Sequence, residues 1–382
     1  MPRYKFDQIA YNIIEKKMPE PGEEKMYIGL EHLDSGNLRV TRWGSDVELT
    51  GEKLRMKKGD ILFGRRNTYL RRAAIAPHDG IFSAHGMIFR PKTDVIDPDY
   101  FPFFISSDYF MDAAIRISVG SLSPTVNWKA LKELEFEIPS LEVQRKSAEV
   151  LQAINDTKEA YQDLLEKTDE LVKSQFIEMF GDPEENPLGW DTRPLLTMGS
   201  CKNGMNFHSN DSGVEINCLG VGDFKDYDVI EDTHMLPAVS LNEMPSEDYL
   251  LKDGDIVFVR SNGNKTMVGR SVIVYPGDNP TTFSGFCIRY RNEDESIMVP
   301  YLLRVLKTES VRKQMYGRGA NIQNLNQKTL AALKIPIPPM EAQRQYVEIV
   351  EQSDKSKFEL KKNIDSLQAL MRAKQQDDFV NQ

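Results

Sequence analysis

The chain is poor in the residues that build metal centres and disulfide scaffolds. Its 382 residues include three cysteines, Cys201, Cys218 and Cys287, and no two of them form a C-x-x-C pair. This excludes a disulfide framework and a cysteine-based zinc site, and it is typical of a protein from the reducing cytoplasm. The five histidines are scattered and include no H-x-x-x-H pair, so no histidine-based metal motif is present either.

Signals that would direct the chain to a membrane are also missing. The segment from Met1 to Lys17 has no apolar stretch followed by small residues, so it does not look like a secretory signal peptide. Nowhere does an apolar run approach the ~18 residues that a membrane span needs. We therefore expect a cytoplasmic protein without a membrane partner.

The sequence lacks a motif for catalysis as well. A phosphate-binding G-x-x-x-x-G-K-[ST] loop is absent, which excludes a P-loop NTPase. Residues 97–100 (DPDY) are close to the Asp-Pro-Pro-Tyr element of adenine methyltransferases, but the second proline is missing and no glycine-rich loop accompanies them. We interpret them as the start of a helical stretch from Pro98 to Ile115. The chain is expected to bind and position a ligand without reacting with it.

Positive charge is in deficit. Lysine and arginine number 48 against 58 aspartate and glutamate residues, which gives a net charge of −10 and a pI of about 5.2. The sum argues against a nucleic-acid-binding protein, because a basic face is the usual footprint of that class. The acidic residues are concentrated in helices and loops, however, so a local basic face remains compatible with this composition.

Glycine and proline are absent from residue 141 to residue 180, and Gly181 follows where a C-terminal glycine stop belongs. Apolar residues recur in this segment at spacings of three and four. They are Val150, Ile154, Tyr161, Leu164, Leu165, Leu171 and Val172. The pattern predicts one amphipathic helix of roughly 40 residues, which at ~1.5 Å per residue is a rod of ~60 Å.

The same segment returns at the end of the chain. Residues 340–379 repeat residues 141–180, and the E-x-Q-R letters of residues 142–145 fall on those of residues 341–344. Each copy follows a short extended segment that contains proline. Because two amphipathic helices of equal length can bury their apolar faces against each other, we expect them to pack as a pair.

The regions before the two helices also correspond. Residues 57–63 (KKGDILF) match residues 252–258 (KDGDIVF), and both read as a turn that enters an apolar strand. A segment rich in glycine and proline, 181–190, separates the halves and reads as a linker. We predict an α+β fold with a first domain over 1–140, a long helix over 141–181, a second domain over 182–339 and a second long helix over 340–382.

Polar, basic loops follow the repeated apolar strand in both halves. Arginine forks bind guanine edges and phosphates, and asparagine binds adenine, so these loops are candidates for DNA contact. The candidates there and in neighbouring loops are Arg65, Arg66, Asn67, Tyr69, Arg71, Arg72 and His85 in the first half, and Arg260, Ser261, Asn262, Asn264, Lys265, Arg270, Arg318, Asn321 and Gln323 in the second. Arginine-rich turns are often only solvated surface, but their recurrence at one scaffold position favours binding.

The order of these features resembles the specificity (S) subunit of type I restriction–modification enzymes. The resemblance is carried by two variable domains, each ending in a proline-bearing strand followed by E-x-Q-R and a long helix, and by the linker from Phe180 to Trp190. It covers essentially the whole chain. One departure is that the first half begins at Tyr4 without an Asn-Pro-x-Gly-Trp lead, which concerns the domain boundary alone.

The resemblance implies two mixed α/β target-recognition domains joined by two antiparallel coiled-coil helices, with an internal pseudo-two-fold. Each domain would read half of a bipartite, asymmetric site in double-stranded DNA. Two methyltransferase (M) subunits with S-adenosylmethionine would methylate adenine N6, and restriction (R) subunits with ATP and Mg would translocate and cleave. This chain would be non-catalytic and hold no cofactor or metal. A ~60 Å rod would keep the half-sites within ~18 base pairs at ~3.4 Å each.

Two other interpretations stay open at this point. One is a specificity partner of a fused methyltransferase–nuclease, which would have the same sequence features and differ in its partner. The other is a coiled-coil adaptor with two ligand-binding domains and no role on DNA. The repeated E-x-Q-R helix starts and the paired basic loops disfavour the adaptor.

Overall fold

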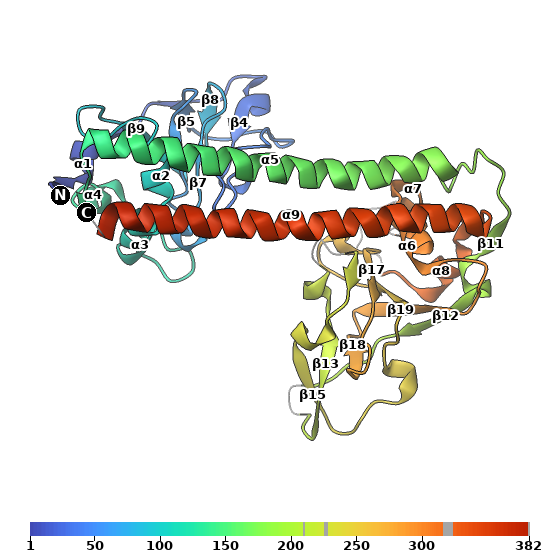
Figure 1. The fold of residues 1–382 in the computed structure, drawn as a ribbon. Helices are drawn as coiled ribbons and strands as arrows, with labels where there is room; N and C mark the ends of the chain where they lie inside the picture. Colours follow the sequence, from blue (N-terminus) through green and yellow to red (C-terminus); the bar gives the residue numbers. More distant parts are fainter. Residues whose placement is uncertain (209–210, 225–227, 316–323, 381–382) are drawn as a thin grey trace. The chain divides into compact units, whose positions relative to one another are not determined.

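The computed structural model describes residues 1–208, 211–224, 228–315 and 324–380 (Figure 1). It divides the chain into two compact units, Met1–Leu164 with Glu359–Gln382 (unit 1) and Leu165–Phe358 (unit 2). Each unit contains one mixed α/β domain and part of both long helices. This division cuts through the helices, and the domain limits drawn from the sequence stay a prediction.

Unit 1 is built on two four-stranded sheets. The strands are β1 (Arg3–Lys5), β2 (Ala10–Ile13), β3 (Lys16–Lys17), β4 (Tyr27–Ile28), β5 (Lys53–Met56), β6 (Ile61–Phe63), β7 (Ala73–Ile75), β8 (Gly80–Phe82), β9 (Met87–Pro91) and β10 (Glu135–Glu137). The short helices are α1 (Phe6–Ile9), α2 (Phe101–Ser106), α3 (Asp108–Arg116) and α4 (Trp128–Leu131). The sheets have the orders β2-β9-β6-β7 and β3-β5-β8-β4, and β1 pairs with β10.

Unit 2 repeats this plan. Its strands are β11 (Thr192–Pro194), β12 (Gly199–Asn203), β13 (Val214–Leu219), β14 (Val229–Ile230), β15 (Ala238–Leu241), β16 (Asp255–Val259), β17 (Ser271–Val274), β18 (Thr281–Phe283), β19 (Cys287–Asn292) and β20 (Lys334–Pro336). Its short helices are α6 (Val299–Lys307), α7 (Glu309–Met315) and α8 (Gln327–Ala332). The sheets have the orders β12-β19-β16-β17-β14 and β15-β13-β18, and β11 pairs with β20 as β1 pairs with β10.

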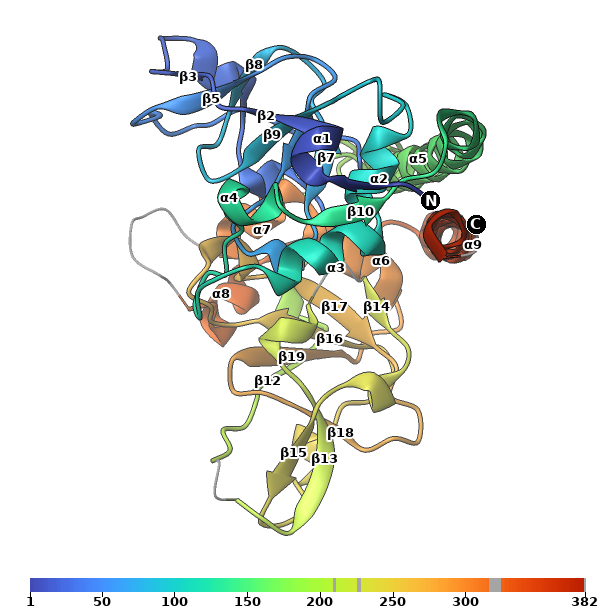
Figure 2. The ribbon, with the colours of Figure 1, turned by 90° about the vertical axis from the view of Figure 1, so that its left-hand side faces the viewer.

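The central strands β16 and β17 of the larger sheet of unit 2 are buried on both faces, which fits their mostly apolar sequences. Ile256 and Phe258 of β16 pack with the helices α6 and α8, whereas Val257 and Val259 pack toward β13 and β18. The small sheet β15-β13-β18 lies on the side of the larger sheet away from α6 (Figure 2).

The repeated Gly-Asp-Ile turn has one structural role in both units. Gly59 has a φ of 87°, a left-handed conformation that glycine adopts at little cost. The next residue, Asp60, is buried and accepts two hydrogen bonds of 2.5 and 2.9 Å from the Arg90 guanidinium. In unit 2, Asp255 and Arg291 form the same pair at 2.8 and 2.7 Å. The hydrogen bond to the aspartate raises the pKa of its arginine in each case, and the pair ties neighbouring strands together.

The glutamine of each E-x-Q-R motif fastens a long helix to its own domain. Gln144, at the start of α5 (Leu141–Phe180), is fully buried. Its Oε1 accepts from the Asp97 backbone N–H at 2.7 Å, and its Nε2 donates to the carbonyls of Val95 and Pro139 at 3.1 and 2.8 Å. One side chain therefore satisfies three buried backbone groups that would otherwise be unpaired.

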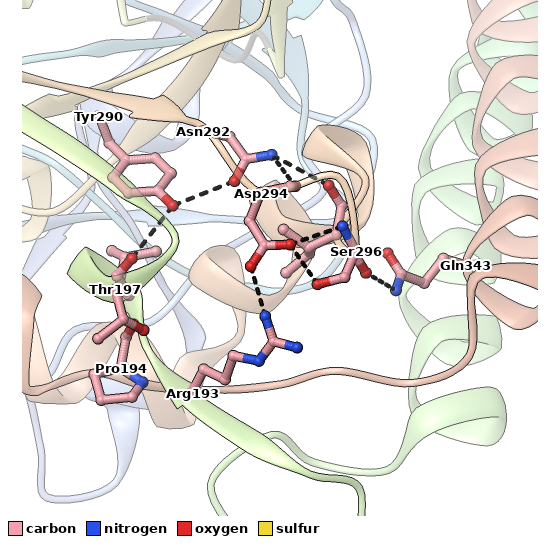
Figure 3. Close-up of polar contacts among 10 residues, drawn as sticks. Arg193, Pro194, Thr197, Tyr290, Asn292, Asp294, Ser296 and Gln343 are labelled. Carbon is pink, nitrogen blue, oxygen red and sulfur yellow. Dashed lines mark hydrogen bonds and ion pairs between the residues drawn. The ribbon is translucent and has the colours of Figure 1, made fainter.

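Gln343, at the start of α9 (Met340–Val380), does the same in unit 2. It accepts from the Met298 N–H at 2.8 Å and donates to the carbonyls of Ser296 and Pro338 at 3.0 and 2.8 Å. Figure 3 shows how this contact continues into the domain, where Asp294 accepts from both Ser296 and Arg193. The motif is thus a structural joint between helix and sheet.

The two long helices pack together as an antiparallel pair, as the resemblance implied. In unit 2, Asp169 of α5 contacts Lys357 of α9 at 3.0 Å, and further along α5 the ring of Phe176 lies 5.4 Å from that of Tyr346. The residue number therefore falls in α9 as it rises in α5. In unit 1, Ser147 donates to Asp378 at 2.7 Å, which joins the start of α5 to the end of α9.

The apolar pattern predicted for α5 turns out to consist of two stripes. Ile154 is buried and Tyr161, Leu165 and Val172 are half-buried, which makes them the packing side of the helix. By contrast Val150, Leu164 and Leu171 are 47, 48 and 52% exposed. The last three are multiples of seven residues apart, so they form a separate apolar line along the helix. Spacing of three and four could not separate the two stripes.

The helical stretch expected over Pro98–Ile115 is in fact two helices, α2 and α3, broken at Ser107. Ser107 is extended, with φ −66° and ψ 152°, and its Oγ accepts the Phe110 N–H at 3.2 Å. Serine favours this N-cap role because its side chain replaces a missing backbone partner. After the break, α3 packs Phe110, Met111 and Ala114 into the core of unit 1.

Candidate nucleic-acid interface

The first arginine loop (residues 64–72) leaves β6 at its C-terminal end. The Gly64 N–H donates to the Arg72 carbonyl at 2.9 Å and closes the neck of the loop. The Val126 N–H donates to the Arg65 carbonyl at 2.9 Å, and the Asn67 N–H donates to the Pro124 carbonyl at 2.8 Å. The loop before α4 therefore lies against the first arginine loop and forms one surface with it.

The four arginines of this loop differ in how they are held. Arg71 forms ion pairs with Asp108 and Asp112 of α3, and Arg72 donates to the Leu30 carbonyl at 3.2 Å. These two side chains fasten the loop to the domain. Arg66 is exposed, with one contact of 3.4 Å to the Ser123 hydroxyl, and the buried Nε of Arg65 has no partner among the described residues. Unlike Arg71, Arg65 and Arg66 are not committed to an ion pair with any described residue, and of these two Arg66 is the more exposed.

Two further candidates in unit 1 are placed at the surface. The Tyr69 side chain is 56% exposed. His85 is exposed on the turn between β8 and β9. Asn67 is half-buried in a left-handed conformation with φ 54°, which asparagine tolerates better than most residues. Asn67 Oδ1 is buried without a partner in the described part of the chain.

The second arginine loop (residues 259–270) occupies the same place in unit 2. The Leu325 N–H donates to the Arg260 carbonyl at 2.9 Å, as Val126 does to Arg65. Arg65 and Arg260 are therefore equivalent positions of the repeat, defined by backbone contacts and not by sequence alignment alone. The Arg260 side chain is half-buried and donates through one Nη1 to the Gly285 carbonyl at 3.1 Å.

The asparagines of the second arginine loop shape its backbone. Asn262 Oδ1 accepts the Asn264 N–H at 2.8 Å, and Asn264 Oδ1 accepts the Thr266 N–H at 3.0 Å. Such side-chain turns are the usual local role of asparagine. Ser261 and Arg270 are half-buried in the same loop. The candidates Arg318, Asn321 and Gln323, together with the side chain of Lys265, lie outside the described residues.

The sequence reasoning missed one prominent residue of this surface, Phe286. It occupies in unit 2 the position that His85 has in unit 1, because each lies three residues after the phenylalanine of the repeated Phe-Ser pair. Its side chain is 60% exposed, and its carbonyl accepts the N–H groups of Arg260 and Ser261 at 2.7 and 3.2 Å. Composition alone gave no signal, because a lone phenylalanine beside a strand reads as core. The spacing from Phe283-Ser284 could have identified it.

Further features of the described residues concern metal ligands and cysteine thiols. No group of three His, Cys, Asp or Glu side chains there is arranged to hold a metal ion. Burial raises the pKa of the Cys201 and Cys218 thiols to about 12, so neither is a ready nucleophile near neutral pH. Among the described helices, none combines the length and the apolarity required to cross a membrane.

Fold and surface together define a duplicated scaffold that presents two unlike polar surfaces at equivalent positions. The family model "Type I restriction modification DNA specificity domain" matches residues 11–167 and 225–368. The chain belongs to this family, and its two matched segments correspond to the two repeats. The family is that of type I restriction–modification specificity subunits.

Individual relatives agree with this assignment. The chain is 25% identical over 295 residues to the StySPI specificity subunit of Salmonella potsdam, covering 72% of this chain and 62% of that protein. It is 27% identical over 188 residues to the putative MjaX specificity subunit of Methanocaldococcus jannaschii, covering 48% of this chain and 44% of that protein. The chain thus spans less than two thirds of the length of either relative.

Solved structures share the fold. A type I restriction–modification S subunit from M. genitalium superposes with a TM-score of 0.53 at 16% identity, covering 99% of this chain and 96% of that one. A chain from a structure that concerns assembly and conformational transition of a type I restriction–modification system gives a TM-score of 0.55 at 16% identity, with 99% and 97% covered.

Proposed function

We propose that this specificity subunit reads a split, asymmetric site in double-stranded DNA, with one half-site for each unit. The observation that carries the proposal is the equivalence of Arg65 and Arg260, which occupy one scaffold position in loops that otherwise differ. Arginine forks bind guanine bidentately in the major groove. One scaffold with two different loops suits two different half-sites. A protein that binds chromosomal DNA would act in the cytoplasm, which is the location expected from the sequence.

Partner subunits would supply the chemistry. In this proposal two M subunits with S-adenosylmethionine methylate adenine N6, one at each half-site, and R subunits with ATP and Mg add translocation and cleavage. The target adenine must leave the base stack to be methylated. The net charge of −10 is compatible with this division of work, because partner subunits would provide much of the phosphate contact.

The exposed apolar residues of the long helices support docking of the M subunits there. Leu171 of α5 is 52% exposed in unit 2, and its repeat equivalent Leu370 of α9 is 53% exposed in unit 1. Paired apolar residues on the outer side of solvated helices are typical of an interaction surface. Two equivalent positions match two copies of one partner.

The test of the main proposal is a methylome. The chain is co-expressed with the methyltransferase encoded next to it, and N6-methyladenine is mapped across the host DNA by long-read sequencing. The expected result is one motif of two short defined blocks around an undefined spacer. A soluble complex that binds its cofactor and yet adds no methylation would contradict the proposal and favour the adaptor.

Single substitutions then assign the half-sites. Arg65→Ala is expected to relax or weaken only one block of the motif, and Arg260→Ala only the other, by ~1–3 kcal/mol for each lost bidentate base contact. Arg116→Ala, an exposed arginine at the end of α3, is the matched control and should leave both blocks unchanged. If Arg65→Ala and Arg260→Ala both leave affinity and motif intact, the loop assignment is wrong.

Docking is tested by stoichiometry. Leu171→Arg and Leu370→Arg are each expected to lower the number of bound M subunits from two to one, measured by native mass spectrometry, because a charge replaces an apolar contact. The neighbouring exposed Glu170→Arg serves as control. Retention of two M subunits by the double variant would show that the docking surface lies elsewhere.

The proposal extends to the spacer between half-sites. Inserting one heptad into α5 near Ala153–Lys167, with a matching heptad in α9, lengthens the pair by ~10 Å, or about three base pairs at ~3.4 Å each. The methylome of this variant should show a spacer longer by that amount. An unchanged spacer would exclude a measuring role for the helices.

A further inference from the structure

Phe286 is an exposed aromatic residue on a turn that is held rigidly from three sides. Its carbonyl accepts the N–H groups of Arg260 and Ser261, and its own N–H donates to the Ser284 hydroxyl at 3.3 Å. The Gly285 N–H donates to the Met205 carbonyl at 2.7 Å. The turn therefore has a fixed backbone, while 60% of the Phe286 side chain remains accessible.

The chain packs closely around this turn, and at Gly204 the neighbouring backbone leaves no room for a side chain. A Cβ on Gly285 would lie 2.1 Å from the Asn206 side chain, and a Cβ on Gly204 would lie 2.0 Å from the Ser284 carbonyl oxygen. Close packing of the backbone beneath a side chain that is left in solvent is a poor way to stabilise a fold. It is an effective way to present a ring in one orientation, because little entropy is then lost on binding.

Phe286 lies beside the polar side chain of Arg260. The Arg260 side chain lies along the same turn, since its Nη1 donates to the Gly285 carbonyl. The remaining N–H groups of that guanidinium have no partner among the described residues. In unit 1 the equivalent position is occupied by His85, an exposed ring that also accepts and donates hydrogen bonds. At this position unit 2 therefore has an apolar ring, Phe286, and unit 1 has a polar ring, His85.

We infer that Phe286 reads the 5-methyl group of a thymine in the half-site of unit 2, next to the base that Arg260 reads. This inference rests on the proposed function and adds a named contact to it. Thymine presents the one apolar group on the base edges of the major groove, and phenylalanine is among the side chains that contact it. A phenyl ring beside an arginine fork matches a thymine beside a hydrogen-bonding base.

The experiment removes the methyl group without disturbing base pairing. The full complex with its M subunits is titrated with duplexes in which each thymine of the motif is replaced in turn by uracil. One replacement in the half-site of unit 2 is expected to weaken binding about fourfold, the effect of losing one buried methyl group at ~0.8 kcal/mol. Phe286→Ala should bind the thymine and uracil duplexes equally well. Phe286→Leu should keep part of the preference, because leucine is still apolar.

His85→Ala is the matched variant in unit 1, and it should leave the uracil effect in the half-site of unit 2 intact. Uracil sensitivity that survives in Phe286→Ala would overturn the inference, as would insensitivity of the wild-type complex to every replacement. If Phe286→Ala weakens thymine and uracil duplexes alike, the ring acts as a wedge and the inference is likewise wrong. In these cases the wild-type complex still methylates a split motif, whereas failure of the proposed function would remove that methylation altogether.

Discussion

The end of each long helix is held by a cluster of side chains, and the two clusters differ in chemistry, because a charged network is present in unit 1 and rings take its place in unit 2. In unit 1 the polar clamp consists of Tyr100, Ser147, Lys374 and Asp378: the fully buried Asp378 accepts from Ser147 at 2.7 Å, from Lys374 at 2.5 Å and from Tyr100 at 3.3 Å. Burial and the nearby carboxylate raise the pKa of the Tyr100 hydroxyl, which therefore stays protonated and donates.

In unit 2 the aromatic clamp consists of Phe176, Phe180, Tyr301 and Tyr346. The rings of Phe180 and Tyr301 are 4.9 Å apart, and Phe176 lies 5.4 Å from Tyr346. Tyr346 and Tyr301 are the repeat equivalents of Ser147 and Tyr100. The joint of unit 1 thus adds a charged network to the ring contacts of Phe379 with Tyr109 and Phe104, at 4.6 and 5.9 Å, whereas the joint of unit 2 is made by rings that meet edge-on or tilted. Duplication preserved the position of the joint, and the chemistry of each copy changed independently.

Among substitutions in the two clamps, Phe176→Ala is expected to cause the largest loss of stability. Deleting a fully buried ring leaves a cavity among three other rings, which costs about 4 kcal/mol of unfolding free energy. Hydrogen–deuterium exchange should show faster exchange in peptides from the C-terminal part of α5. The adjacent Ile177→Ala, 46% exposed, is the control and should change little. Equal effects of the two substitutions would contradict the view that ring packing holds this joint.

Asp378→Ala is expected to cost about 3 kcal/mol in unit 1, because it leaves Lys374, Ser147 and Tyr100 without their shared acceptor. Faster exchange should appear at the end of α9 and leave the aromatic clamp protected. Asp365→Ala, exposed on the same helix, should lie within ~0.5 kcal/mol of wild type. A loss as small as that of the control would mean that the polar clamp contributes little.

The two units should respond equally where their chemistry is the same. Gln144→Ala and Gln343→Ala each remove three hydrogen bonds to backbone groups, so each should cost about 2 kcal/mol. Thermal unfolding and exchange at the start of the affected helix measure the loss. Clearly unequal losses would show that the motif has different roles in the two copies.

The smallest effect is expected from removing a hydroxyl. The Tyr346 hydroxyl is buried with no hydrogen-bond partner in the described part of the chain, so Tyr346→Phe should change stability by about 0–1 kcal/mol, in the stabilising direction. Tyr100→Phe deletes a bond to a carboxylate and should destabilise by about 1.5 kcal/mol. Differential scanning calorimetry of the pair decides whether the hydroxyls differ. Destabilisation by Tyr346→Phe would indicate an unseen partner, such as a bound water.

The candidate interface was partly predictable. The sequence located the loops after the repeated strand, because glycine, aspartate and apolar residues mark that turn wherever it occurs. It could not separate Arg71, held by Asp108 and Asp112, from Arg66, which is exposed, since those aspartates lie about 40 positions away in the sequence. Phe286 escaped notice for the same reason, because exposure is a property of the folded chain.

The amino-acid sequence by itself determined the duplication, the two long helices and the joints at their starts. These features depend on local periodicity, on the absence of glycine and proline, and on a repeated four-letter motif, all of which act over short distances along the chain. The tertiary structure alone decided which apolar stripe of α5 is buried, which arginines are committed to ion pairs and how the far end of each helix is clamped. Those outcomes depend on contacts such as Ser147 with Asp378, between residues more than 200 positions apart, and no local pattern encodes such a contact.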